Sequence, residues 1–329
     1  MGPSQTISTC LEELLGADPP RAGSLAITIF GDVISQQGGS VWLGSLVTAM
    51  AEFGLNERQV RTALFRLVKD DWLTAEQRGR RSFYALSPAG QRHYARAAAR
   101  IYAFEHASWD GEWTLVMPGA IAPSAREHLR KRLGWQGFGL LGSSMLAHPR
   151  ADAGALAETL AELDIETGVV VWRAHALDDE PLRELVRSAW QLEDIAARCS
   201  AFVKRFEPVA ALLDDDAPYT GRDALVLRCV LIHDYRRILL RTIDLPPELL
   251  PADWPGFAAM RLVRHVYGQV HAAASAYAST VLERAQGQLP APGASFHARF
   301  GGLPHASGTA TRSTPTGGRR RGGPALETC

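Results

Sequence analysis

Residues 56–69 read Asn-Glu-Arg-Gln-Val-Arg-Thr-Ala-Leu-Phe-Arg-Leu-Val-Lys, and this stretch has the clearest helical pattern in the chain. Asn56 is a favourable helix N-cap, and Gln59 stands three residues later, where its side chain completes a capping box. Apolar side chains then recur at spacings of three and four residues, which places on one stripe Val60, Ala63, Leu64, Leu67 and Val68. The stretch therefore predicts an amphipathic helix with one buried face.

The opposite face of this helix is polar and cationic. A projection at 100° per residue gathers there Arg58, Thr62, Arg66 and Lys69, with Gln59 and Arg61 on its flanks. Phe65 also projects outward, although we expect its ring to pack under the following hairpin beside Trp72. Taken alone, such a face is usually an ordinary solvated surface, so its neighbours in the chain decide its interpretation.

The elements around this helix predict a winged helix-turn-helix domain over residues 23–107. Two helices are expected before it, at 24–36 and 41–53, and one after it, from Pro88 towards residue 104. Residues 73–77 and 82–86 are expected to form two short strands, joined by Arg78-Gly79-Arg80-Arg81, with Gly79 allowing a tight turn. In that motif the second helix of the turn enters the major groove, and the hairpin, or wing, follows the DNA backbone.

The charge distribution agrees with a DNA-binding face. The whole chain has 35 basic and 35 acidic residues and no formal net charge. Residues 54–100, however, contain ten Lys or Arg against four Asp or Glu. Side chains that form bidentate contacts with bases are expected at Arg58 and Gln59, near the helix N-terminus, whereas Arg78, Arg80 and Arg81 are expected to contact phosphates. Neutrality thus excludes a protein that coats DNA indiscriminately, not one that docks by one face.

The middle of the chain, residues 108–178, has the element order βαββαβ, which predicts a ferredoxin-like module. We expect it to pair subunits or to bind a ligand. A metal nuclease site on such a module would need an acidic ligand at the end of the first strand. The first strand here runs from Trp113 to Pro118 without an acid at its end, so no nuclease site is expected.

The remaining segments are expected to be a flexible arm at 1–22, a helical C-terminal domain at 179–286 and a disordered tail at 287–329. The tail is rich in Gly, Pro, Ser, Thr and Arg, a composition typical of disorder. Its arginines either add nonspecific DNA affinity or simply keep the tail solvated. The fold class is thus α+β with several domains.

A second group of arginines lies in the predicted C-terminal helices. Arg237 and Arg241 are four residues apart on one helix, and with Arg228 or Arg236 they are candidates for binding a phosphate group of a ligand. The alternative is a set of salt bridges to the acids around residues 214–216. The adjacent His233 and Asp234 do not share a helix face, which argues against a catalytic dyad.

Several classes of protein are excluded by what the sequence lacks. Its four cysteines show no metal-ligand or disulfide spacing, and no apolar run is long enough to span a bilayer. No phosphate-binding loop, dinucleotide motif or nucleophile elbow occurs. We therefore expect a cytoplasmic protein that is not an enzyme and has no catalytic residues, metal or cofactor.

Long motifs in matching order resemble the phenylacetic-acid degradation repressor family (PaaX type). The matching stretches are residues 29–32, 41–46, 60–68, 71–73, 78–84, 86–90, 101–102, 109–113, 233–237 and 245–256. The most specific is Val-Arg-Thr-Ala-Leu-Phe-Arg-Leu-Val at 60–68, and Leu-Pro-Pro-Glu-Leu-Leu-Pro-Ala-Asp-Trp-Pro-Gly at 245–256 is the longest. The resemblance covers residues 24–285.

This resemblance implies a homodimeric repressor of aromatic-acid catabolic genes that binds double-stranded operator DNA. It also implies release by an aryl-acetyl-CoA effector, phenylacetyl-CoA or a related aryl-CoA, and a central module similar to CRISPR-associated nucleases. Two alternatives stay open: an enzyme acting on acyl-CoA or nucleic acid, and a DNA-binding family member with no small-molecule effector.

Overall fold

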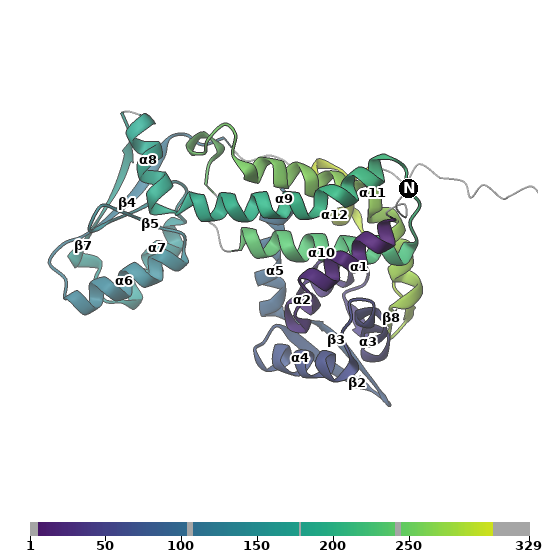
Figure 1. The fold of residues 1–329 in the computed structure, drawn as a ribbon. Helices are drawn as coiled ribbons and strands as arrows, with labels where there is room; N and C mark the ends of the chain where they lie inside the picture. The colour runs from purple at the N-terminus through teal and green to yellow at the C-terminus, as the bar shows by residue number, and fades with distance from the viewer. Residues whose placement is uncertain (1–5, 104–107, 178, 241–244, 305–329) are drawn as a thin grey trace, which may run out of the picture.

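The protein is described by a computed structural model that covers residues 6–103, 108–177, 179–240 and 245–304. Figure 1 shows three parts: a lower part made by the N-terminal elements, a small sheet with helices at the left, and a layer of long helices across the top. The chain is mixed helix and sheet, as the sequence predicts.

The lower part contains the predicted helices and hairpin. In chain order its elements are α2 (Ala22–Asp32), η1 (Ile34–Gln36), β1 (Ser40–Trp42), α3 (Leu43–Ala51), α4 (Glu57–Lys69), β2 (Leu73–Arg78), β3 (Arg81–Leu86) and α5 (Pro88–Ile101). The antiparallel sheet has the order β1-β3-β2, with Trp42 opposite Phe83. Strand β1 was not expected, because the helical spacing of residues 41–53 extends by chance into it.

The N-terminal segment, which the sequence predicted to be a flexible arm, contains a packed helix. Residues 7–17 form helix α1 (Ile7–Ala17), capped by Thr6. Ile7, Cys10, Leu11 and Leu14 are buried against the C-terminal helices, and each such side chain contributes roughly 1.5–3 kcal/mol by leaving water. Their spacing of three and four residues is helical, but a single short apolar patch next to two prolines was too weak a signal.

The central part has the predicted order βαββαβ. Its elements are β4 (Glu112–Pro118), α6 (Pro123–Trp135), β5 (Gly139–Leu141), β6 (Met145–His148), α7 (Ala153–Glu162), η2 (Glu166–Gly168) and β7 (Val169–His175). The sheet is antiparallel with the order β5-β6-β4-β7, so β7 lies at an edge. Val116 packs with α6 and α7 on one face, and Trp113 faces the other.

The C-terminal part consists of long helices. They are α8 (Asp179–Ala189), α9 (Leu192–Asp214), α10 (Gly221–Leu239), η3 (Pro247–Leu249) and α11 (Pro255–Val281). Helix α10 is buried on almost all sides and packs on α2 and α5 of the lower part as well as on α9 and α11. The predicted DNA-binding and C-terminal domains therefore share one hydrophobic core instead of forming two separate cores.

Residues 287–304, the first part of the segment predicted to be a disordered tail, are ordered. Residues 283–304 contain β8 (Glu283–Arg284), β9 (Gly287–Gln288), α12 (Ala294–His297) and η4 (Arg299–Gly301). Phe296, Arg299 and Phe300 are buried in the shared core. An average over forty residues hid these three side chains, which anchor the segment. Residues 305–329 lie outside the described part of the chain.

Arg299 belongs to a buried ionic cluster that joins the lower part to the helices. Asp32 Oδ2 lies 2.6 Å from Arg228 Nε, and Asp32 Oδ1 lies 2.7 Å from Arg299 Nη1. The hydroxyls of Tyr102 and Tyr267 donate to the same carboxylate. Burial alone would raise the pKa of Asp32, but the two guanidinium groups and these hydrogen bonds outweigh it and lower the pKa.

Candidate nucleic-acid interface

Helix α4 begins with the predicted capping box. The Asn56 side chain accepts from the backbone N–H of Gln59, and Gln59 Oε1 accepts from the backbone N–H of Asn56, both at 2.9 Å. Val60, Ala63, Leu64 and Leu67 are buried. The cap uses the carbonyl oxygen of Gln59, so only its amide NH₂ remains to contact an adenine edge, and its bidentate contact is not available in this conformation.

The outer face of α4 is solvent-exposed. Its exposed residues are Arg58, Gln59, Arg61, Thr62, Phe65, Arg66 and Lys69. Arg61 is held by Glu57 one turn earlier, with Nη2 and Oε1 2.6 Å apart. In the described part of the chain, no ion pair joins an acid to Arg58, Arg66 or Lys69. These three cations are therefore available to a polyanion.

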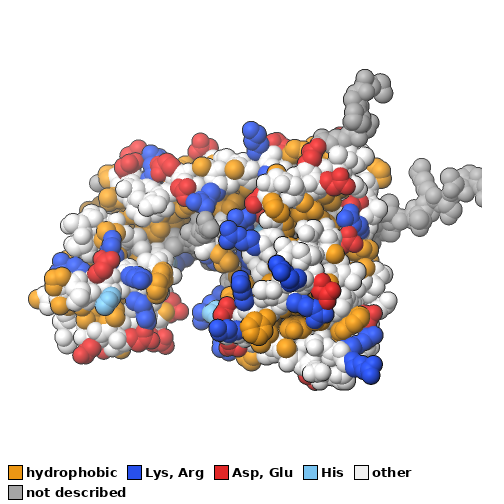
Figure 2. Space-filling view, turned by 60° about the horizontal axis from the view of Figure 1, so that its bottom comes forward, with side chains coloured by type: hydrophobic (Ala, Val, Ile, Leu, Met, Phe, Trp, Pro, Cys, Tyr) orange, Lys and Arg blue, Asp and Glu red, His pale blue; other side chains and the backbone are white. Residues whose placement is uncertain are grey.

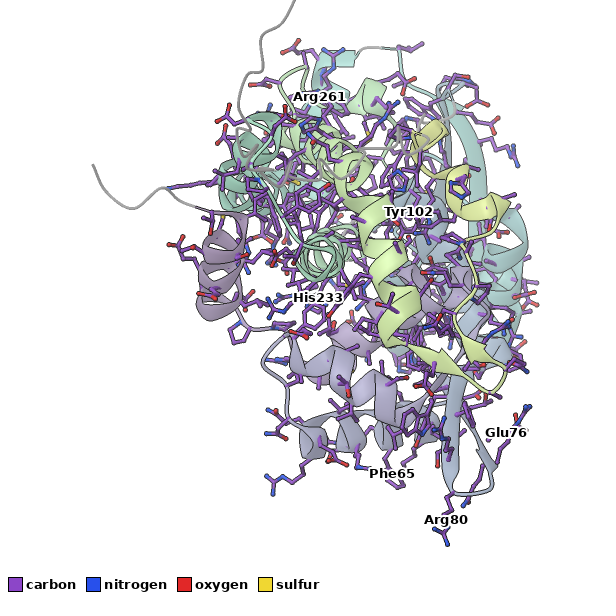
Figure 3. The ribbon with its side chains drawn as sticks, turned by 90° about the vertical axis from the view of Figure 1, so that its right-hand side faces the viewer. Phe65, Glu76, Arg80, Tyr102, His233 and Arg261 are labelled. Atoms are coloured by element: carbon purple, nitrogen blue, oxygen red, sulfur yellow. The ribbon has the colours of Figure 1, made fainter. Side chains whose placement is uncertain are left out.

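Phe65 lies in the middle of this face, and its position corrects the sequence interpretation. Its side chain is 71% exposed and does not pack beside Trp72, which stacks on His93 with ring centroids 5.1 Å apart. Figure 3 shows Phe65 and Arg80 at the lower surface, projecting away from the body, while Tyr102 and His233 lie inside. A single exposed apolar side chain is common on protein surfaces, so Phe65 by itself does not indicate a function.

The hairpin of β2 and β3 carries the other predicted cations, all of them exposed. Gly79 at its turn has φ +63°. Arg78 Nε lies 2.7 Å from Glu76 Oε1, and this hydrogen bond lowers the pKa of the Glu76 carboxyl. Within the residues that the structure covers, Arg80 has no acidic partner. Figure 2 shows Lys and Arg side chains gathered on the side of the lower part that faces the viewer.

Arg81 differs from the other wing arginines. Its guanidinium lies 4.2 Å from the centre of the Trp42 ring, and its Nη1 lies 2.9 Å from Glu283 Oε2 on β8. The wing is thus tied to the C-terminal segment close to its turn. No local pattern predicted this contact, because Glu283 is 202 residues from Arg81 in the chain.

The four arginines predicted to bind a ligand phosphate do not form one site. Arg228 is fully buried on Asp32, which corrects its assignment, because no surface exposes its guanidinium. Arg236 donates to Ser24 on α2, and Arg237 pairs with Asp18 at 3.0 Å. Arg241 lies outside the described residues. Arg228 and Arg237 form salt bridges, as the alternative predicted. Their partners are Asp32 and Asp18 near the N-terminus, however, and not the acids around residues 214–216.

His233 and Asp234 also have separate partners. His233 Nδ1 lies 3.4 Å from the Thr28 hydroxyl, and burial lowers the His233 pKa to about 4. Asp234 Oδ2 lies 3.1 Å from Arg205 Nε. This arrangement agrees with the expectation that the two residues do not form a dyad.

A membrane span and a metal site are both absent from the described ranges. No helix in the described ranges is long and apolar enough to cross a membrane. No three or more His, Cys, Asp or Glu side chains in those ranges gather in a way that could hold a metal ion.

Known proteins match this chain over most of its length. Family profiles match residues 21–90 (PaaX-like protein), 106–186 (PaaX protein central Cas2-like domain) and 190–280 (PaaX-like protein C-terminal domain). The transcriptional repressor PaaX of Escherichia coli (strain K12) is 39% identical over 301 residues, which are 90% of this chain and 95% of that protein. A solved structure of an uncharacterized protein from Mycobacterium tuberculosis is 22% identical, with a TM-score of 0.46, and the match covers 71% of this chain and 89% of that one.

Proposed function

Since the chain belongs to the PaaX-like protein family, we propose that it is a DNA-binding transcriptional repressor of genes for aromatic-acid catabolism of the phenylacetate type. The named relative is a transcriptional repressor, so the expectation of a regulator and not an enzyme is confirmed. The exposed, cationic outer face of α4 is the observation that carries the DNA-binding proposal. Its operator DNA places its action in the cytoplasm.

The lower part acts as a winged helix-turn-helix domain. α3 and α4 form the helix-turn-helix, α4 enters the major groove, and the β2–β3 wing follows the backbone. Arg58, at the N-terminal end of α4, reads a base edge, with Thr62 beside it. The remaining cations hold phosphates: Arg61, Arg66, Lys69, Arg78, Arg80 and Arg81. Arg61, Arg78 and Arg81 must leave or share an acidic partner to do so, which makes their contribution smaller.

The central part acts as a ferredoxin-like dimerisation module. Its edge strand β7 exposes Val170, Val171 and Trp172, and an apolar edge of this kind is a template for pairing with another strand. A second copy of β7 that pairs antiparallel would cover these residues and continue the sheet. Such a homodimer presents two copies of α4 to two half-sites of an inverted repeat.

An aryl-acetyl-CoA, phenylacetyl-CoA or a related aryl-CoA, releases the repressor. The ligand must bind the released arrangement of the subunits more tightly than the DNA-bound one, because only differential affinity shifts the equilibrium. No protein cofactor is needed for this cycle.

Gel shifts on the DNA upstream of the protein's own gene, with and without phenylacetyl-CoA, other acyl-CoAs and free CoA, test this function. We expect a discrete complex that phenylacetyl-CoA dissolves and free CoA does not. If a complex forms but no acyl-CoA dissociates it, the protein binds DNA and the proposed effector is wrong. No complex on any promoter fragment would overturn the repressor proposal.

A further inference from the structure

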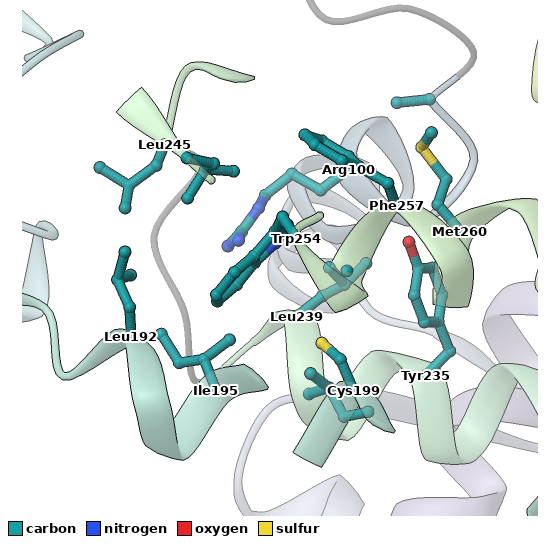
Figure 4. Close-up of a pocket in the computed structure, with 14 residues that line it drawn as sticks. Arg100, Leu192, Ile195, Cys199, Tyr235, Leu239, Leu245, Trp254, Phe257 and Met260 are labelled. Carbon is teal, nitrogen blue, oxygen red and sulfur yellow. The ribbon is translucent and has the colours of Figure 1, made fainter. Parts of the chain in front are cut away.

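A cavity lies between helix α5 of the lower part and the long C-terminal helices. Its volume is about 100 Å³, with further space at its open mouth, so it suits one group of a ligand and not a whole drug-sized ligand. Its walls come from the end of α5, from α9 and α10, and from the segment between Leu245 and Met260 (Figure 4). None of the site residues expected from the sequence lines it.

The walls of this cavity suit an aromatic group. Tyr235, Trp254 and Phe257 contribute rings, and Cys199 and Met260 contribute sulfur atoms. Aliphatic side chains complete the lining: Leu192, Ile195, Ile238, Leu239, Leu245 and Leu250. Rings favour offset or edge contacts with another ring, and sulfur atoms pack well against ring edges. A flat apolar group therefore has favourable partners on several sides.

One cation stands in this apolar lining. Arg100, in the last turn of α5, is the only charged residue among the described ones that line the cavity. Figure 4 shows its side chain reaching inward, with the guanidinium next to the Trp254 indole. In apolar surroundings a guanidinium is a strong hydrogen-bond donor to a carbonyl or carboxylate oxygen. The cavity thus combines a place for a ring with a donor for an acyl oxygen.

The cavity is close to both the DNA-binding part and the central sheet. Helix α5 follows directly after β3 of the wing, so Arg100 lies on the element that leads out of the DNA-binding part. Leu192 and Trp254 belong to the cluster that also contains Trp113 of the central sheet. A ligand that contacts Arg100 and Trp254 together touches the DNA-binding part directly and reaches the central sheet only through this cluster.

We propose that this cavity binds the aromatic acyl group of the effector, with the ring against Trp254 and Phe257 and the acyl oxygen near Arg100. Binding there sets the orientation of α5 and the wing relative to the central sheet, and hence the separation of the two α4 helices in a dimer. The inference rests on the proposed function for the identity of the effector.

A second cavity lies nearby, between α2, α5 and α10, and it provides a competing site. Its lining includes Asp32 and Tyr102 of the buried ionic cluster, together with Arg236 and Leu240. A ligand there would have to lie against a carboxylate already satisfied by two arginines. The two cavities are separated by adjacent residues of one chain segment, because Leu239 lines the first and Leu240 the second.

This adjacency supplies a matched pair of variants. Leu239→Trp fills the first cavity, and Leu240→Trp places the same side chain one residue later, at a position that is 51% exposed. Titration calorimetry of the full chain with phenylacetyl-CoA measures ligand binding without DNA, and gel shifts on the upstream DNA report folding and operator binding. We expect Leu239→Trp to weaken phenylacetyl-CoA binding at least about tenfold, and Leu240→Trp to change it less than about twofold, with both variants still binding DNA.

A second pair tests the role of Arg100 itself. Arg100→Met should weaken phenylacetyl-CoA binding, and Arg100→Lys should restore part of it. Arg96→Met removes the same charge from an exposed position one turn earlier on α5 and is the control. Equal effects of Arg96→Met and Arg100→Met would mean that only the overall charge matters, which would overturn the assignment of Arg100.

The outcomes separate this inference from the proposed function. Undiminished ligand binding by Leu239→Trp, in a wild-type protein that phenylacetyl-CoA releases from DNA, overturns the cavity assignment and leaves the function intact. If Leu239→Trp weakens phenylacetyl-CoA binding but phenylacetyl-CoA does not change operator binding by the wild type, the cavity assignment is supported and release by this ligand is overturned. If the wild type binds DNA but not phenylacetyl-CoA, both the effector and the cavity assignment are wrong.

Discussion

Arg58 and Arg66 lie on the exposed face of α4, whereas Arg228 and Arg299 lie in the core on either side of Asp32. The exposed pair has no acidic partner in the described part of the chain. The buried pair shares the Asp32 carboxylate, which also accepts from two tyrosine hydroxyls, and Arg228 donates to the Ser275 hydroxyl. An unpaired charge is inexpensive in water and very costly in a core. Position therefore divides the arginines into those that can bind DNA and those that hold the molecule together.

The largest expected effect is on stability, and it comes from removing the carboxylate between the two buried arginines. Asp32→Asn leaves two buried guanidinium groups without their anion, and we expect a loss of about 3–5 kcal/mol in the free energy of unfolding. Denaturant unfolding followed by circular dichroism measures it. Asp18→Asn, which removes the partner of the exposed Arg237, is the control and should cost at most about 1 kcal/mol. Similar losses for both variants would contradict the importance of burial.

The same variant has a signature in the pH dependence of stability. The folded pKa of Asp32 is lowered, so the unfolded state takes up a proton at higher pH than the folded state does. Its stabilising contribution is fully present above the unfolded value of about 3.9 and is lost as the pH falls through the lower folded pKa. Acid unfolding curves of Asp32→Asn should therefore be less steep below about pH 4 than those of the wild type. Parallel curves would show that the Asp32 carboxylate contributes nothing to the acid sensitivity.

On the exposed side, the largest effect is expected from the proposed base contact. Arg58→Ala should cost roughly 1–3 kcal/mol in operator binding and relax the preference at a single base position. Fluorescence anisotropy on operators with single base changes measures both. An equal loss on every sequence would make Arg58 a phosphate contact.

A smaller effect on DNA binding should distinguish Arg80 from Arg78, which forms an ion pair with Glu76. Arg80→Ala should weaken binding to all DNA sequences and reduce the slope of log K against log salt by about one. Arg78→Ala should change the slope less, because Glu76 already neutralises its guanidinium. If the two variants behave alike, the ion pair with Glu76 does not limit the role of Arg78.

The smallest expected effect concerns Arg81. Glu283→Gln removes the acid that holds this arginine and also one negative charge beside the wing. Operator affinity should rise, by no more than about fivefold, since exposed ion pairs contribute up to about 1 kcal/mol. An unchanged or lower affinity would show that this ion pair positions Arg81 and does not compete with DNA.

Local patterns predicted the exposed side of the molecule well. The capping box at Asn56, the buried stripe of α4 and the βαββαβ order all depend on residues close in sequence, and the structure contains them. Distant partners were not predictable in this way. Arg228 is buried because α10 is surrounded by helices from both ends of the chain, and its partner Asp32 is 196 residues away.

The same limit explains the errors at the two ends. Helix α1 and the segment with Phe296 and Phe300 become ordered by packing on the shared core, whereas their composition resembles that of a flexible chain. The cavity near Arg100 is also built by residues from four separate segments. In the sequence, Trp254 appears only within the family-like stretch at 245–256, and nothing in that stretch predicted a cavity.

The central claim is that the outer face of α4 binds DNA, and a charge-matched comparison tests it most directly. The triple variant Arg58→Ala, Arg66→Ala, Lys69→Ala removes three positive charges from α4, and Arg130→Ala, Lys131→Ala, Arg132→Ala removes three from α6. Gel-shift titration of the upstream DNA should show that the α4 variant no longer forms the specific complex, while the α6 variant binds within about threefold of the wild type. Equal losses in the two variants, or an α4 variant that still binds, would contradict the account.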